Sequence, residues 1–147
     1  MADHGDSVTI EWLILADAAQ IAGNKLYLLG GGWDSITIGQ VFPVDHNMAA
    51  AIAIRIPWGE TNQRHDFEIE FITQDGQSLT KINGQIEAGR PGSLKPGQDQ
   101  RSQIAINVGL RLEGPNSFGV IGRIDGVEQA RTGFSVVAGP GAVQKQA

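Results

Sequence analysis

The chain has 147 residues, with 11 basic and 16 acidic side chains that give a formal net charge of −5, and it contains no cysteine. Apolar residues make up 41% of the chain, and its 20 glycines and 6 prolines are too few for a low-complexity sequence. These values exclude a disordered or collagen-like chain, disulfides and cysteine-bound metals. The length is typical of one domain, and the acidic balance argues against nucleic-acid binding.

The two ends of the chain carry no apolar pattern. Asp3 and Asp6 stand where a secretory signal has positive charge ahead of an apolar stretch. The longest apolar runs, residues 12–16 and 48–54, are far shorter than the roughly 20 residues that cross a bilayer. We therefore expect a cytoplasmic protein without membrane attachment. Its single domain is predicted at residues 8–137, between flexible ends at residues 1–7 and 138–147.

Alternation of apolar and polar residues predicts strands from the start of the domain. Residues 8–16 begin with this alternation and become apolar on both faces, which is typical of a central strand covered on both sides. Residues 17–21 have helical spacing and are expected to form one helical turn capped by Asp17. Shorter strands are predicted at residues 25–30 and 35–39 because turn-forming residues bound them.

The alternation is clearest in the middle of the chain. Phe67, Ile69 and Phe71 alternate with acidic residues over residues 65–73, which places both phenylalanines on one buried face. The same period predicts strands at residues 52–56, 79–88, 104–112, 118–124 and 128–137.

Three dipeptides have the composition of tight turns. Asp75-Gly76 and Asp125-Gly126 each separate two apolar-periodic segments and are predicted to close hairpins. Asn83-Gly84 falls inside the segment 79–88, where it can form a third turn or a bulge within one strand. About eight to nine short antiparallel strands with almost no helix predict an all-β fold, a two-sheet antiparallel β-sandwich of immunoglobulin-like or related type.

Several phrases of the sequence are distinctive in combination. They are residues 13–20 (LILADAAQ), 25–34 (KLYLLGGGWD), 55–62 (RIPWGETN), 89–92 (GRPG) and 99–101 (DQR). In these phrases the chain resembles an uncharacterised bacterial family of small β-sandwich proteins, a domain of unknown function, over about residues 9–137. The resemblance implies one compact β domain and assigns no activity, cofactor or catalytic residue.

The loops suggest where a binding site could lie. If successive strands run antiparallel and residues 35–39 form a separate strand, the loops at residues 31–34, 57–64, 89–102 and 125–126 reach the same end of the sandwich. If residues 29–38 are instead one continuous bulged strand, Trp33 is separated from the other loops. Their tryptophan, arginine, acidic and amide side chains are Trp33, Asp34, Trp58, Glu60, Asn62, Arg64, Arg90, Asp99 and Arg101. Because tryptophan rings beside guanidinium groups can stack on a sugar, a nucleobase or a partner side chain, we take this set as candidate ligand- or partner-binding residues.

A purely structural role for the same residues stays open. The two tryptophans can plug the end of the core, while Arg90 and Arg101 pair with Asp34, Glu60 or Asp99 to order the long loops. Exposure of the rings distinguishes these interpretations. Exposed rings in a concave surface favour a ligand, and exposed rings on a flat apolar patch favour a protein partner.

Patterns typical of catalysis are weak. His4, His46 and His65 do not have metal-ligand spacing, and the chain has no nucleophile elbow or phosphate-binding loop. We therefore expect a non-enzymatic binding or accessory module of a bacterium or bacterial virus, without cofactor or metal. Its partner is expected to be an unidentified protein, with association into a homo-oligomer left open. The alternative is a small-ligand or carbohydrate-binding domain that uses the tryptophan-rich end.

Overall fold

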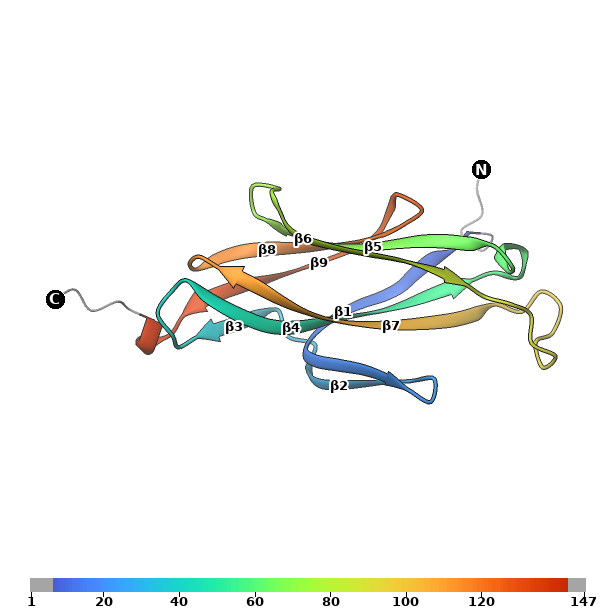
Figure 1. Cartoon of the computed structure of the whole chain (residues 1–147), viewed down its shortest axis with the longest axis horizontal. Helices are drawn as coiled ribbons and strands as arrows, with labels where there is room; N and C mark the ends of the chain where they lie inside the picture. Colours follow the sequence, from blue (N-terminus) through green and yellow to red (C-terminus); the bar gives the residue numbers. More distant parts are fainter. Residues whose placement is uncertain (1–6, 143–147) are drawn as a thin grey trace.

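The computed structural model describes residues 7–142, which form two β-sheets packed face to face (Figure 1). Sheet A has the strand order β2-β1-β4-β7, and sheet B has the order β3-β9-β8-β5-β6. The strands are β1 (Thr9–Ala22), β2 (Lys25–Gly31), β3 (Ser35–Ile38), β4 (Val44–Ile56), β5 (Arg64–Thr73), β6 (Ser78–Glu87), β7 (Gln100–Leu112), β8 (Asn116–Ile124) and β9 (Val127–Ala138), and two short 3₁₀ helices are η2 (Trp58–Glu60) and η3 (Pro140–Ala142). Neither of these helices is long and apolar enough to cross a membrane, and the described residues offer no other candidate.

The strand order is that of an immunoglobulin-like sandwich. Strands β1, β4 and β7 lie side by side and antiparallel in one sheet, and β9, β8, β5 and β6 do so in the other. Across the first sheet, β1, β4 and β7 correspond to the immunoglobulin strands A, B and E. Across the second sheet, β9, β8, β5 and β6 correspond to strands G, F, C and C′. The four-residue β3 runs parallel to β9 and is a separate strand. The predicted two-sheet sandwich is therefore confirmed.

The core lies between the two sheets, as the alternation predicts. Ile69 and Phe71 of β5 are 0% exposed and face Ile52 and Ile54 of β4, which are buried to the same degree. Phe67 is partly buried and packs against the same core. The inward face of β5 is therefore correctly predicted.

Two of the three turn-like dipeptides close hairpins. Gly76 has a φ of 86° between β5 and β6, and Asp125 and Gly126 have φ values of 50° and 82° between β8 and β9. Two successive positive φ values are the type I′ geometry that matches the twist of a two-residue hairpin.

The third dipeptide, Asn83-Gly84, is neither a turn nor a bulge. It lies within the continuous strand β6, where Asn83 pairs with Glu68 and Gly84 pairs with Phe67 in unbroken register. A Cβ on Gly84 would lie 2.7 Å from Cζ of Phe67. The glycine is needed here because the phenylalanine ring packs directly over its backbone.

Strand β1 continues past the point where its alternation weakens. Residues 17–21 are part of this strand, so the predicted helical turn is wrong. Beyond Ala16, β1 leaves β4 and pairs with β2, and the resulting hairpin projects from the sandwich on the side of sheet A (Figure 1). We call this hairpin, residues 17–31, the arm.

Small side chains hold the arm over the outer face of sheet A. The side-chain amide of Asn107 on β7 bonds to the arm as the peptide group of a neighbouring strand would. Its Nδ2 donates to the carbonyl of Ala19 at 3.0 Å, and its Oδ1 accepts from the Ala19 N–H at 3.2 Å. A second buried cluster forms there from Ala16, Ala19, Ala49 and Ala51, with Trp12, Leu26 and Ala105 packed against it. This extra layer explains why β4 is buried on both of its faces.

The end of the domain lies later than predicted. Residues 138–142, assigned above to a flexible tail, contain the last residue of β9 and helix η3, and Ala142 is 7% exposed. The amide of Gly139 donates to the carbonyl of Ile38, which ties this segment to β3. The remainder of the predicted flexible ends, residues 1–6 and 143–147, lies outside the described residues.

Candidate functional site

Three of the four predicted loops meet at one end of the sandwich. The register pairs Ile56 with Gln100 and Arg64 with Glu87, so the connections β4-β5 and β6-β7 lie together. The amide of Asp125 donates to the carbonyl of Asp66, which brings the β8-β9 turn to the same place. We call these segments, residues 57–64, 88–99 and 125–126, the loop end.

Trp33 and Asp34 do not belong to the loop end, and their predicted place there is wrong. The carbonyl of Asp34 accepts a hydrogen bond from Ser135, which lies about 26 Å along β9 from Val127 at a rise of about 3.3 Å per residue. The Trp33 ring stands edge-on to Phe134 with a centroid distance of 5.9 Å and packs against the core. Parity predicts the direction of a strand but not its length. Because β2 has 7 residues against 14 in β1, the chain crosses between the sheets partway along the sandwich.

Trp58 does lie at the loop end, but one face of its ring is covered. The guanidinium carbon of Arg90 lies 3.7 Å from the ring centroid, the distance of a cation–π contact. The same arginine donates from Nε to Oγ1 of Thr61 at 2.7 Å and from Nη2 to the carbonyl of Trp58 at 2.8 Å. Arg90 therefore ties the β6-β7 loop to the β4-β5 loop.

The other charged candidates are also paired within the chain. Both carboxylate oxygens of Glu11 accept hydrogen bonds from Arg101, at 2.9 and 2.8 Å, which lowers the pKa of Glu11. Asp99 forms an ion pair with Arg55. Arg64 lies 3.8 Å from Glu87. The partner of Arg101 differs from those expected, and each of these ion pairs connects two different segments of the chain.

Asn62 has a backbone role in this region. Its φ is 60°, and its backbone N–H donates to the carbonyl of Ala88 at 2.7 Å. Asparagine tolerates this left-handed conformation better than most residues, which explains its position in the loop.

A buried histidine lies beneath the loop end. His65 is 5% exposed, with Nδ1 2.9 Å from Oδ2 of Asp125 and Nε2 3.1 Å from the carbonyl oxygen of Glu60. Burial, the largest single influence, acts to lower the pKa of His65, but the hydrogen bonds and both carboxylates outweigh it, so the pKa lies above its ordinary value. Because both ring nitrogens are engaged, this histidine fastens three segments together and has no free nitrogen to serve as a base.

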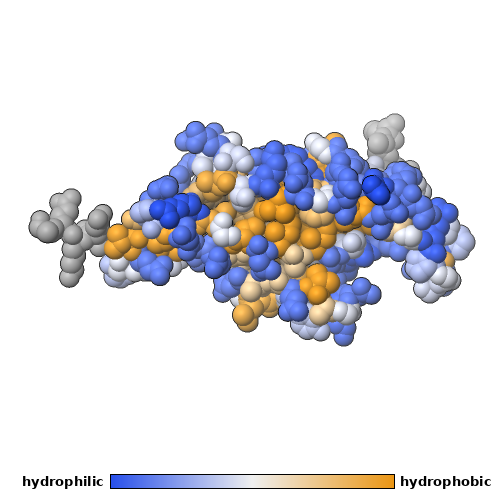
Figure 2. All heavy atoms as spheres, in the orientation of Figure 1, coloured by the Kyte–Doolittle hydropathy of each residue, from blue (hydrophilic) through white to orange (hydrophobic). Residues whose placement is uncertain are grey.

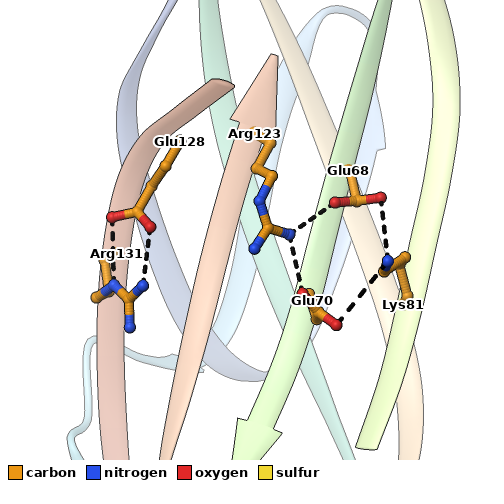
Figure 3. Close-up of polar contacts among 6 residues, drawn as sticks. All are labelled: Glu68, Glu70, Lys81, Arg123, Glu128 and Arg131. Carbon is orange, nitrogen blue, oxygen red and sulfur yellow. Dashed lines mark hydrogen bonds and ion pairs between the residues drawn. The ribbon is translucent and has the colours of Figure 1, made fainter. Parts of the chain in front are cut away.

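Paired charges also cover the outer face of sheet B (Figure 3). Nη1 of Arg123 donates to Glu68 at 2.6 Å and to Glu70 at 2.9 Å, and Lys81 lies 3.7 and 4.0 Å from the same two carboxylates. Hydrogen bonds from Ser78 and then Arg123 hold the pKa of Glu70 below its ordinary value. An open hollow of about 440 Å³ lies beside this network, lined by Asp66, Phe67, Glu68, Asn83, Gly84, Gln85, Arg123 and Gly126. The two carboxylates of the network, Glu68 and Glu70, are both paired with Arg123 and Lys81.

The arm is the region that sequence reasoning missed. Tyr27, Leu28 and Leu29 are 55%, 37% and 71% exposed, whereas the other exposed large hydrophobic residues of the described chain are scattered singly. Figure 2 shows hydrophobic surface on the part that projects from the sandwich. A hollow of about 320 Å³ lies there, lined by Ala18, Ala19, Gln20, Tyr27, Leu28 and Leu29. The available signal was that residues 26–29 are apolar without alternation, although no predicted element covers their second face.

Comparisons with known proteins identify the family of this chain, and two solved structures show a distant likeness. An immunoglobulin-like protein from Pseudomonas aeruginosa is 9% identical over 91% of this chain and 99% of its own, with a TM-score of 0.40. A glycosyl hydrolase family 2 member from Bacteroides cellulosilyticus is 7% identical over 90% of this chain and 26% of its own, with a TM-score of 0.38. Neither likeness assigns a residue role or an activity here. A search of curated proteins finds no match. A family model matches residues 11–137, and the chain therefore belongs to that family, which is described as a family of unknown function (DUF6941).

Proposed function

We propose that this protein is a non-enzymatic interaction module that binds another protein chain through its arm. The observation that carries the proposal is the combination of three consecutive exposed apolar residues, Tyr27 to Leu29, with an edge of β2 that pairs with no other strand among residues 7–142. An open, apolar edge strand is a template for pairing with another chain. Main-chain hydrogen bonds along such an edge supply affinity, and the alternate side chains supply specificity.

The composition of β2 strengthens this proposal. Proteins usually protect an edge strand with charges, proline or a bulge, and β2 carries a single charge, Lys25, at its first residue. Strand β6, one of the two edge strands of sheet B, carries Lys81 and Glu87 instead. The hydrophobic surface visible between β6 and β7 in Figure 2 belongs to partly buried side chains that pack against the sandwich core. The side chains on the outer face of the arm, Tyr27 and Leu29, belong to neither of the two core clusters.

A small-ligand or carbohydrate site at the loop end is the weaker candidate. Such a site needs an accessible aromatic face, and the described geometry puts Arg90 over Trp58 and packs Trp33 against Phe134. An enzymatic role finds as little support, since His65 has both nitrogens engaged and the carboxylates of the outer face of sheet B are paired with cations.

Site-specific photo-crosslinking in cells that naturally produce the protein tests the proposal. A photoreactive phenylalanine analogue replaces Tyr27 in one variant and Val127, which is 59% exposed, in the matched control. We expect position 27 to give a discrete protein adduct, identified by mass spectrometry, and position 127 to give none. Absence of an adduct at position 27, or the same adducts at both positions, would overturn the proposal.

A further inference from the structure

The backbone of Leu28 points toward the open edge of the arm. Leu28 lies directly opposite Ala19 in the antiparallel pair of β1 and β2. Both backbone groups of Ala19 are hydrogen-bonded to the Asn107 side chain, so they are turned away from β2. Opposed residues in an antiparallel ladder either exchange both hydrogen bonds or direct their N–H and C=O groups to the other side. The N–H and C=O of Leu28 are therefore directed away from β1, along the edge that β2 leaves unpaired in the described residues.

This edge is complementary to itself. When two copies of β2 meet antiparallel with Leu28 opposite Leu28, their N–H and C=O groups form one mutual pair of hydrogen bonds. The same register sets Tyr27 of each copy opposite Leu29 of the other, on the exposed face of the arm. Leu29 is itself opposite Ala18, whose small side chain borders the hollow of about 320 Å³. The tyrosine ring of the second copy then lies beside this hollow and can fill it, which is the aromatic–aliphatic pairing that stabilises sheets.

The charges of the arm select the antiparallel direction. Lys25 is at the first residue of β2, and Asp17 lies against Gly30 near its last residue. Antiparallel pairing sets the Lys25 end of one copy beside the Gly30-Gly31 end of the other, which Asp17 borders, whereas in-register parallel pairing sets the two lysines together. Opposite charges across strands are favourable and like charges are not. Gly30 and Gly31 carry no side chains to obstruct the lysine.

We infer that two copies of this chain form a twofold dimer by antiparallel pairing of their β2 edges, centred on Leu28. The two arms then join into one small sheet of strand order β1-β2-β2-β1 across the dimer. A twofold contact of this kind uses the same patch on both copies and closes without leading to a filament. This inference rests on the proposed function, for which it names the partner.

Sedimentation velocity of the purified full chain, from low micromolar to several hundred micromolar, tests the pairing. We expect a species of twice 15.6 kDa that increases with concentration. Leu28→Pro removes the N–H that faces the partner and spares the hydrogen bonds to β1, so it should weaken the dimer about a hundredfold or more. Leu28→Thr keeps the N–H and is the matched control, and it should retain the dimer.

A second variant keeps the test valid if Leu28→Pro disturbs the arm, which circular dichroism and the melting temperature of the variant report. Leu29→Lys changes a side chain that is 71% exposed and sets a charge opposite the tyrosine of the second copy, so it should weaken the dimer about tenfold or more. Val127→Lys, at a comparably exposed valine outside the arm, should leave the dimer unchanged.

The register has a direct measurement. The chain has no cysteine, so Lys25→Cys carries a single spin label. Pairing centred on Leu28 separates the two labelled backbones by about 20 Å, from a rise of about 3.4 Å per residue, and pulsed electron paramagnetic resonance measures this distance.

The outcomes separate the two proposals. A monomer at every concentration, a dimer insensitive to both Leu28→Pro and Leu29→Lys, or a label distance incompatible with the register would overturn the dimer. In that case a discrete adduct of Tyr27 with a different protein in cells still supports the interaction function. Absence of any adduct at Tyr27 in cells overturns the interaction function itself.

Discussion

The loop end and the arm use aromatic and charged residues in opposite ways. At the loop end, Arg90 covers one face of the half-buried Trp58 ring, and His65 is held between Asp125 and the carbonyl of Glu60. On the arm, Tyr27 and Leu29 remain exposed beside a strand edge that has no neighbour in the described residues. The tryptophan, arginine and acidic residues that suggest binding therefore have contacts within the chain, whereas the exposed surface of the arm consists of one tyrosine and two leucines.

The difference has a simple physical origin. Long loops lose conformational entropy when they are ordered, and side-chain contacts such as that of Arg90 with Trp58 offset this loss. A hairpin is ordered by the backbone hydrogen bonds between its two strands. Its side chains are therefore not needed to order it and can remain exposed. The arm also rests on small alanines, which lets it lie close to sheet A while its other face stays open.

The largest effect we predict separates the sandwich core from the arm. Phe71→Ala empties a site that is 0% exposed and should reduce the free energy of unfolding by about 3–5 kcal/mol. Leu29→Ala, at a side chain that is 71% exposed, should change the stability of the monomer by less than about 0.5 kcal/mol. Denaturant unfolding at a concentration that keeps the chain monomeric measures both. Equal losses would contradict the division between core and arm.

The next effect concerns the attachment of the arm. Asn107→Ala removes both hydrogen bonds to Ala19 and should cost about 1–2 kcal/mol. Hydrogen exchange should accelerate at the backbone amides of the arm more than in the sandwich, because the arm loses its hydrogen bonds to β7 while the core keeps its packing. Asn47→Ala, at an exposed asparagine on the neighbouring strand β4, is the control and should leave exchange in the arm unchanged. Uniform acceleration in both regions would mean that the arm is not a separate unit.

A smaller loss is expected at the loop end. Arg90→Ala removes the contact with Trp58 and should reduce stability by about 0.5–1 kcal/mol. Arg64→Ala, at a side chain that is 75% exposed and 3.8 Å from Glu87, should have almost no effect. Thermal melts measure the losses, and sedimentation should give the same association for both variants as for the unchanged chain. Weaker association of Arg90→Ala would move the interaction surface toward the loop end.

The smallest effect is a slope with pH at the loop end. The pKa of His65 is raised in the folded chain, so its contribution to stability is complete below the ordinary histidine pKa of about 6.5 and is lost as pH rises through the folded value. Unfolding free energies measured between pH 6 and 9 should fall for the unchanged chain and fall less for His65→Gln. Burial acts to raise the pKa of Asp125, but the hydrogen bonds with His65 and the Asp66 backbone outweigh it, so the pKa lies below its ordinary value. The stability that this carboxylate contributes is therefore lost as pH falls through its folded pKa. An identical slope for His65→Gln would exclude His65 as its source.

The sequence determined the fold class and the inward faces of the clearest strands. Alternation over residues 65–73 correctly predicts which side of β5 is buried, and the two Asp-Gly dipeptides correctly predict hairpin turns. These features are local, because a period of two and a positive φ depend on neighbouring residues alone. The resemblance carried by the short phrases agrees with the family match over residues 11–137.

The tertiary structure decided which residues are used and which remain free. The helical spacing of residues 17–21 was misleading because Ala19 packs with Ala49 and Ala51, which are far away in the sequence. Asn83-Gly84 has the composition of a turn, yet the glycine is there for the ring of Phe67 on another strand. Trp33 lies away from the loop end because the length of β2, and not its direction, determines where the chain crosses between the sheets. Each of these outcomes depends on a contact between distant segments, and a local pattern contains no record of such a contact.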